Sequence, residues 1–240
     1  MKDEIIIDVE DLTLAYNENP VVWDADVEII NNSRTAIIGP NGAGKSTFLK
    51  GILGLIKPLA GEVKIMGKTP KDARKHIAYI PQTASVNWDF PTNVLDVVLM
   101  GRYKSLGWIK RPGKKDMEIA KAALNKMGMY EYKNRQISEL SGGQRQRVFL
   151  ARAICSDAQI YFMDEPLAGV DMMTEKIIMD TIKDFQANGK TIVAVHHDLN
   201  TIKEYFDHVV IINRRVLAYG PMDQAFTEEN LQIAYKKGRD

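Results

Sequence analysis

A glycine-rich loop at residues 39–46 narrows the possible folds of this chain more than any other segment. Its sequence, Gly-Pro-Asn-Gly-Ala-Gly-Lys-Ser, fits the pattern G-x-x-x-x-G-K-[ST], with an apolar run at 35–38 before it and a helical pattern at 47–53 after it. Glycines let the backbone curl so that successive N–H groups point at one anion, and the following helix adds its positive N-terminal end. The order strand, loop, helix therefore predicts a phosphate-binding loop in an α/β fold.

The residue types in this loop predict what its members do. Lys45 is expected to reach the β- and γ-phosphates of a nucleotide, and the Ser46 hydroxyl is expected to ligate Mg²⁺. Further members of the loop and of the first helical turn are expected to contact ATP. The expected ATP-binding set from this segment is Gly39, Asn41, Gly42, Gly44, Lys45, Ser46 and Thr47.

Short β-rich runs recur along the chain, at 5–9, 35–38, 63–66, 77–80, 160–163, 191–195 and 209–212. Several are continuously apolar, as expected for strands covered on both faces of a sheet. Helical patterns separate some of them, and apolar residues share one face in two of these helices. They are Met117, Ala120, Leu124 and Met127 in one, and Ile178, Ile182 and Phe185 in the other, which is expected to end at Asn188-Gly189. Strands that alternate with helices predict an α/β domain with a mostly parallel sheet.

The middle of the chain has a different character. From about 83 to 154 there is little strand signal, and a basic stretch rich in proline and glycine, 104–115, precedes further helical patterns. We therefore expect a helical lobe inserted into an α/β core.

Composition excludes several classes of protein. The chain has 240 residues, enough for one large core, and a formal net charge of +1, which gives no global attraction to nucleic acid. Its single cysteine, Cys155, excludes an internal disulfide framework and fits a reducing compartment. No apolar run approaches the roughly 18 residues that a membrane-spanning helix needs. We expect a soluble, cytosolic protein whose membrane role, if any, comes through a partner.

A second half of a nucleotide site follows the apolar run 160–163. Asp164 and Glu165 close this predicted strand. An acid at a strand end holds Mg²⁺ through water in phosphate-loop enzymes, which is the role expected of Asp164. Glu165 is placed to orient or deprotonate the attacking water, and so to act as a catalytic residue.

A third motif, Leu-Ser-Gly-Gly-Gln at 140–144, precedes a predicted helix. A hydroxyl, bare backbone N–H groups and a helix N-terminus make a second anion site, far along the chain from the phosphate loop. We expect the phosphate loop and this motif to contact the same γ-phosphate only if two chains associate head to tail. At this point the sequence resembles the ATP-binding-cassette (ABC) ATPases over essentially its whole length.

The resemblance implies a fold and a domain plan. The fold is an α/β phosphate-loop NTPase core, RecA-like and of the ABC type, with an inserted α-helical lobe and an N-terminal antiparallel β region. Residues 3–238 would form a single ATPase domain, with the core at about 3–82 and 156–238 and the lobe at about 83–155.

The resemblance also implies roles for single residues. Tyr16 would stack on adenine, Gln82 would sense the γ-phosphate and Mg²⁺, and His197 would contact the γ-phosphate as a catalytic switch. Asp171 would belong to a loop that crosses the dimer, although Ala-Gly-Val-Asp here departs from the usual Ser-Ala-Leu-Asp. Two sets complete the picture: a signature of Ser141, Gly142, Gly143 and Gln144 that binds the ATP of the opposite chain, and a Mg²⁺ shell of Ser46, Gln82 and Asp164.

One segment indicates which branch of the ABC ATPases the sequence resembles. Residues 87–91, Asn-Trp-Asp-Phe-Pro, are very similar to a segment in the ATPases of manganese and zinc importers, where the first residue is often Asp. Three further segments resemble the same branch: Gly107-Trp108, Arg111-Pro112 and the histidine pair at 196–197. Trp88 and Phe90 would then contact a permease. The alternative is that both rings only cap the helical lobe.

The resemblance implies an ATPase subunit that energises import of a transition-metal ion, with Mn²⁺ first and zinc or iron as alternatives. ATP and Mg²⁺ are the implied cofactors. The implied partners are a second copy of the chain, a polytopic membrane permease and, through the permease, an extracytoplasmic metal-binding lipoprotein; the expected location is the cytoplasmic side of the cell membrane. A nucleic-acid ATPase is a remote alternative, disfavoured by the net charge and by the lack of sustained heptads between Lys45 and Ser141.

Overall fold

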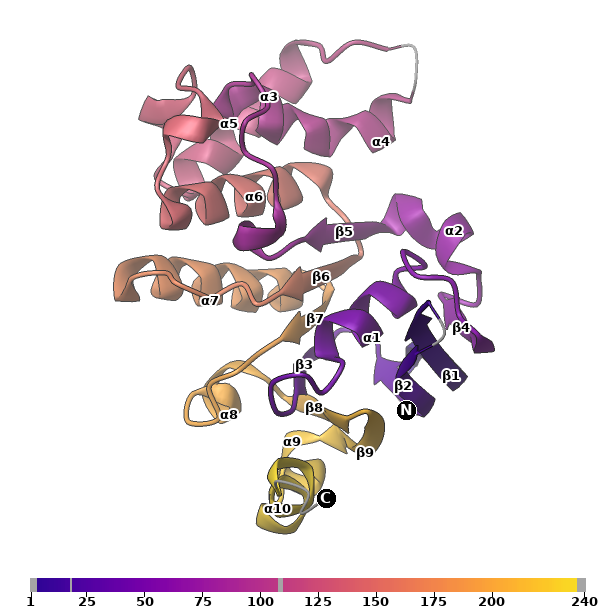
Figure 1. Ribbon diagram of the computed structural model, residues 1–240. Helices are drawn as coiled ribbons and strands as arrows, with labels where there is room; N and C mark the ends of the chain where they lie inside the picture. The colour runs from indigo at the N-terminus through magenta and orange to yellow at the C-terminus, as the bar shows by residue number, and fades with distance from the viewer. Residues whose placement is uncertain (1–3, 18, 108–109, 237–240) are drawn as a thin grey trace. The chain divides into compact units, whose positions relative to one another are not determined.

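A computed structural model describes residues 4–17, 19–107 and 110–236 of the chain (Figure 1). The chain divides into two compact units. The first combines Met1–Arg74 with Phe185–Asp240, and the second is Lys75–Asp184. The boundaries predicted for an inserted lobe, 83–155, fall inside the second unit.

The first unit contains an antiparallel sheet of three strands. Its order is β2 (Asn19–Ile30), β1 (Ile5–Tyr16), β4 (Ala60–Ile65). This is the N-terminal antiparallel region that the family resemblance implies. The sequence runs located only the first part of β1 and missed β2, because Asp24, Asp26 and Glu28 interrupt its apolar residues. These acids face solvent while alternate residues are buried, which is the pattern of a half-exposed strand.

The second sheet of this unit is mostly parallel and lies in its core. The order is β7 (Thr191–Val195), β3 (Arg34–Ile38), β8 (His208–Asn213), β9 (Arg215–Pro221), with β3 parallel to both β7 and β8 and β9 antiparallel at the edge. The three parallel strands are those that continuous apolar runs predicted. The sequence runs missed β9 for the same reason as β2, since its burial alternates along the strand.

One helix joins the two sheets of the first unit. Helix α1 (Lys45–Ile52) follows the phosphate loop, as predicted. A Cβ built on Gly51 would lie 2.3 Å from Leu14 Cδ1, so the helix packs directly on β1. The other helices of the unit are α2 (Pro70–Ala73), α8 (Ile202–Tyr205), α9 (Met222–Ala225) and α10 (Glu228–Tyr235).

The second unit begins with a pair of parallel strands, β5 (Ile77–Ile80) and β6 (Ile160–Asp164). Between them the described residues form helices and no strand, as the sequence predicts. Helices α3 (Val94–Leu99), α5 (Lys114–Lys126) and α6 (Gly142–Ser156) pack against one another (Figure 1). Shorter elements are α4 (Tyr103–Leu106) and the 3-10 turns η1 (Arg74–His76), which starts before the unit, η2 (Thr83–Ser85), η3 (Met100–Arg102), η4 (Tyr130–Tyr132) and η5 (Ile137–Glu139).

The two predicted helix faces are found in α5 and α7 (Met172–Ala187). Most of the residues assigned to these faces are buried, and only Met117 is half exposed. Helix α7 ends beside Gly189, whose φ of 73° is the left-handed conformation expected after a helix end. Within the described residues, no helix is both long and apolar enough to span a bilayer.

Candidate functional site

The phosphate loop lies between β3 and α1 and depends on its glycines. Gly44 has a φ of 91°, and a Cβ there would lie 2.9 Å from Val22 Cγ2. A Cβ on Gly39 would lie 1.9 Å from the carbonyl oxygen of Ile212. The left-handed conformation and the close backbone approach both exclude larger residues. The loop therefore folds as its sequence predicts.

Lys45 lies over the start of this loop. Its side chain is buried, and its Nζ donates hydrogen bonds of 2.9 Å to the carbonyl oxygens of Gly39 and of Pro40. Gly44 is the N-cap of α1 and brings no capping side chain, and no acid stands in the first helical turn. A buried ammonium beside helix N–H groups fits the phosphates of a nucleotide. Ser46 and Thr47 follow in the first turn of α1, which begins at Lys45, two residues before the predicted start at 47.

Sheet topology brings His197 to the same loop. Strands β3 and β7 are parallel neighbours, so the residues after their carboxyl ends meet at one edge of the sheet. His197 and the loop residues Gly39, Pro40 and Asn41 line a hollow of about 520 Å³. Tyr235, at the end of α10, lines it too. No motif marks Tyr235 in the sequence, and only the packing of the last helix reveals it.

The neighbouring His196 has a different environment. It is buried, its Nε2 lies 3.3 Å from Thr201 Oγ1, and its ring packs against Phe206. Burial lowers the pKa of His196, so the ring is neutral at pH 7. His196 thus packs locally, and the exposed His197 is the member of the pair that faces the phosphate loop.

Tyr16 lies at the end of β1, where it pairs with Asn19 of β2. Tyr16 is 51% exposed, so part of the residue is accessible to a ligand. The same hairpin contacts the phosphate loop, because Val22 of β2 packs on Gly44. This position is compatible with the predicted stacking on adenine.

In the second unit, parallel strands again bring predicted residues together. Gln82 follows β5 and Glu165 follows β6, and Gln82 Nε2 donates a 2.8 Å hydrogen bond to Glu165 Oε2. The adjacent Asp164 is buried at the end of β6. Glu165 has a φ of 52°, a left-handed conformation that costs a non-glycine residue about 1–2 kcal/mol. Such strain, held by a buried strand, is common at catalytic residues.

The predicted signature forms the start of α6. Ser141 Oγ accepts the Gln144 N–H at 3.3 Å, and the Gln144 side chain accepts the Ser141 N–H at 2.9 Å. This capping box fixes the loop while Gly142 remains exposed. A Cβ on Gly143 would lie 3.6 Å from Asp171 Oδ2, so the signature and the predicted dimer-crossing loop are neighbours within one chain.

Asp171 has a structural role at the start of α7. Its two carboxylate oxygens accept hydrogen bonds of 2.9 Å from the Thr174 N–H and from the Thr174 hydroxyl. The backbone hydrogen bond, followed by that from the hydroxyl, lowers the pKa of Asp171. Asp171 is therefore a fixed negative charge beside the signature.

The two aromatic residues expected at a permease contact, Trp88 and Phe90, differ in how far they are buried. Trp88 is half buried: its ring centre lies 4.9 Å from that of Phe149, and its Nε1 donates to the Thr83 carbonyl oxygen at 2.9 Å. Trp88 thus packs on the helices, as the alternative interpretation expects of both rings, and its contact with a permease stays a prediction. Phe90 is 64% exposed and remains available to a partner. Trp108, which contributed to the branch assignment, lies outside the described residues.

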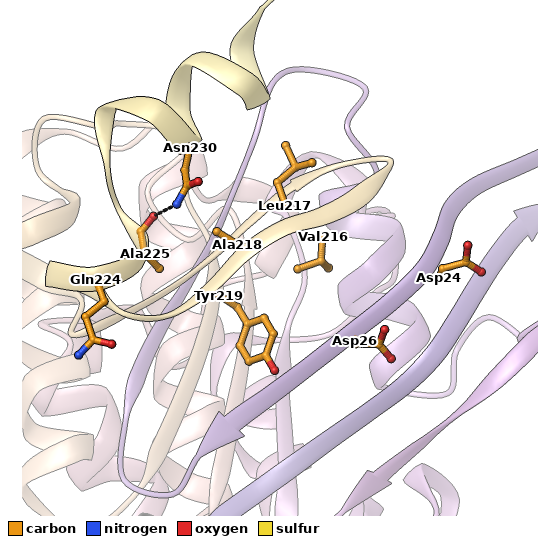
Figure 2. A pocket seen from close by; sticks show the side chains of 9 residues that line it. All are labelled: Asp24, Asp26, Val216, Leu217, Ala218, Tyr219, Gln224, Ala225 and Asn230. Atoms are coloured by element: carbon orange, nitrogen blue, oxygen red, sulfur yellow. Dashed lines mark hydrogen bonds between the residues drawn. The ribbon is translucent and has the colours of Figure 1, made fainter.

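A second hollow in the first unit differs in character (Figure 2). It measures about 420 Å³ and lies between β2, β9, α9 and α10. Asp24, Asp26 and Tyr219 are among its lining residues, and none of the nine described lining residues is basic. Asp24 is already paired with Arg215, whose Nη1 lies 3.1 Å from Asp24 Oδ2, and the lining itself offers no basic side chain to a phosphate. The hollow at the phosphate loop is therefore the candidate nucleotide site.

Comparison with known proteins agrees with this geometry. The family model described as ABC transporter matches residues 22–168. The zinc transport system ATP-binding protein TroB of Treponema pallidum is 56% identical over 229 residues, which cover 95% of this chain and 86% of the relative. The manganese transport system ATP-binding protein MntB of Bacillus subtilis is 53% identical, with 95% and 92% covered.

The fold is likewise found among solved structures. An inward-facing structure of a metal-chelate type ABC transporter superposes with a TM-score of 0.83 at 26% identity, covering 97% of this chain and 89% of that chain. The predicted α/β fold of the ABC type is confirmed.

Proposed function

Because the chain belongs to the ABC transporter family, we propose that it is the ATP-hydrolysing subunit of an importer for a transition-metal ion. The observation that carries the proposal is the phosphate loop with its buried Lys45, faced by His197, in a chain similar over 95% of its length to zinc and manganese transport proteins. Mn²⁺ is the first candidate for the transported ion, and zinc or iron ions come next.

The chain's own residues supply a route to hydrolysis. Backbone N–H groups of the phosphate loop and the Lys45 ammonium hold the phosphates, and Tyr16 stacks on the adenine. Glu165 takes a proton from the attacking water, and its hydrogen bond with Gln82 fixes the carboxylate. His197 donates to the γ-phosphate from the rim of the hollow.

The donor types present fit a Mg²⁺ ion, which prefers hydroxyl, carboxylate, carbonyl and water oxygens. We assign Ser46 as a direct ligand, Gln82 as a side-chain ligand and Asp164 as a ligand through water. An ion held there would neutralise charge on the β- and γ-phosphates. Asp164 suits this role because its carboxylate is an oxygen donor at the carboxyl end of β6, next to Glu165.

ATPase subunits of ABC transport systems dimerise and work with a permease. We propose a head-to-tail homodimer in which Ser141, Gly142 and Gly143 of each chain bind the γ-phosphate of the ATP held by the other. Met172 and Met173, directly after Asp171, support an interface there because they are 87% and 74% exposed. Exposed adjacent methionines are typical of a surface that another protein covers.

The same proposal places the chain at the cytoplasmic side of the membrane, held there by its permease. An extracytoplasmic metal-binding lipoprotein would deliver the ion to that permease. Closure of the dimer on two ATP molecules would move the permease, and loss of the bridging γ-phosphate would let the dimer open.

We expect Phe90 to contribute to the permease contact and Trp88 to the stability of the subunit. Phe90→Ala should leave ATP hydrolysis by the isolated subunit within about twofold of wild type, since a surface substitution changes little. It should reduce co-purification with the permease. Trp88→Ala should lower the free energy of unfolding by about 2–3 kcal/mol, because it removes a ring packed on Phe149.

Thermal melts and pull-down of the permease distinguish the two roles. Leu55→Ala is the matched control, since it removes a 57% exposed apolar side chain from the other unit and should affect neither measurement. Unchanged permease binding by Phe90→Ala would remove Phe90 from the proposed contact.

The transported ion is expected never to bind this chain in transit, although Mn²⁺ could replace Mg²⁺ beside Ser46 and Gln82 when nucleotide is bound. Transition-metal sites need three or four convergent ligands, and the described residues contain no such group of histidine, cysteine and carboxylate side chains. Calorimetry without nucleotide should give no stoichiometric Mn²⁺ or Zn²⁺ binding, while deletion of the gene should impair uptake of one of these ions. Two results would contradict the proposal that this chain drives the conformational change and its partners select the ion. One is tight metal binding without nucleotide, and the other is normal uptake of both ions after deletion of the gene.

A further inference from the structure

The last helix of the first unit, α10, is attached to the carboxyl end of strand β8, in the sheet that carries the phosphate loop. Asn213, the final residue of β8, donates from Nδ2 to the carbonyl oxygen of Ala234 at 2.9 Å. Ala234 is fully buried, and β8 runs parallel to β3. The carboxyl end of β8 thus holds the end of α10 beside Gly39, the first residue of the loop.

This attachment brings Tyr235 to the loop. Tyr235 lines the hollow together with Gly39, Pro40, Asn41 and His197, and it is 37% exposed. The ring therefore lies beside the first residues of the loop, and the hydroxyl is the one polar group of its side chain.

A phenol can accept one hydrogen bond and donate another. Burial raises the pKa of Tyr235, so the hydroxyl keeps its proton at neutral pH. Because Tyr235 lines the hollow beside His197, the hydroxyl can donate that proton to a group bound there.

We propose that Tyr235 is a further nucleotide-binding residue, which donates a hydrogen bond to the terminal phosphoryl group of ATP beside His197. The assignment rests on the proposed function and adds a residue to it. The hollow lies at the phosphate end of the site, because it is lined by Gly39 and Pro40, whose carbonyl groups hold the Lys45 ammonium. Tyr16, the expected adenine contact, does not line it.

The test compares ATP with ADP on Tyr235→Phe, which keeps the ring and removes only the hydroxyl. Both nucleotides are titrated by calorimetry in EDTA, which withholds Mg²⁺ and so prevents hydrolysis. We expect ATP to bind about three- to tenfold more weakly than to wild type and ADP to bind within about twofold, since only ATP carries the third phosphate. Unchanged melting temperature shows that the fold is kept.

Tyr219→Phe is the matched control. Tyr219 is also a partly exposed tyrosine of the first unit, 42% accessible, but it lines the acidic hollow of Figure 2. It should bind both nucleotides as wild type does.

Three results would overturn the assignment of Tyr235. Wild-type ATP affinity in Tyr235→Phe would show that the hydroxyl contributes nothing to binding. Equal weakening of ATP and ADP would show that the hydroxyl shapes the loop and does not contact the terminal phosphate. Failure of the wild-type chain to bind either nucleotide would contradict the proposed function itself, and the role of Tyr235 with it.

Discussion

Glu165→Gln should lower the rate of ATP hydrolysis by about 10²–10⁴-fold while ATP still binds. The substitution replaces a proton acceptor with an amide of the same shape, so the attacking water loses its general base. It leaves the phosphate loop untouched, because Glu165 belongs to the strand end of β6 and not to β3 or α1. A glutamine can also accept the Gln82 hydrogen bond at the same position.

Phosphate release and gel filtration measure the two halves of this expectation. With ATP and Mg²⁺, Glu165→Gln should elute as a stable dimer, because the γ-phosphate that bridges the two chains is no longer lost. Glu131→Gln, at an exposed carboxylate of η4 in the same unit, is the control and should turn over normally. A normal rate of ATP hydrolysis by Glu165→Gln would contradict the assignment of Glu165 as the general base.

Ser141→Arg should abolish ATP hydrolysis but leave the affinity of the monomer for ATP nearly unchanged. Ser141 caps α6 and precedes the exposed Gly142, so an arginine there obstructs the surface that binds the partner's ATP. Loss of the cap should cost about 1 kcal/mol of stability, which a thermal melt detects. Lys45→Ala should instead weaken ATP binding, because it removes the charge that faces the phosphates.

A mixture of these two variants tests whether the site is shared between chains. In a heterodimer, the phosphate loop of the Ser141→Arg chain faces the intact signature of the Lys45→Ala chain. One complete site should form, and hydrolysis should return to a substantial part of the wild-type rate, although each variant alone is inactive. Rates are measured on heterodimers isolated with two affinity tags.

The control is a chain that carries both substitutions. Paired with either single variant it forms no complete site, so it should restore nothing. Absence of activity in purified Ser141→Arg/Lys45→Ala heterodimers would count against the head-to-tail arrangement, unless separate measurements show that both sites must act together.

Several elements could be predicted because their cause is local. The buried strands β3, β5, β6 and β7 are continuous apolar runs, and a run of that kind has few alternatives to a strand covered on both faces. Strands β2 and β9 were missed among these runs because their polar residues alternate with buried ones. Local sequence is also not enough to place Trp88. A lone aromatic residue in a loop is equally consistent with a partner surface and with an internal contact until its neighbours in the fold are known.

The sequence by itself determined the phosphate loop, the signature at the start of α6 and the acids that end β6. Each works through backbone conformation and residue type within a few positions, as the left-handed Gly44 and the capping box of Ser141 show. Tertiary structure alone decided that Gln82 holds Glu165, that His197 faces the loop while His196 is buried, and that Tyr235 reaches Gly39. These pairs come from segments far apart in the chain. Gln82 meets Glu165, and His197 meets the loop, because parallel strands align their carboxyl ends. Tyr235 reaches the loop because α10 is attached to the end of β8. Strand order and helix docking are set by packing of the whole unit rather than by any short pattern.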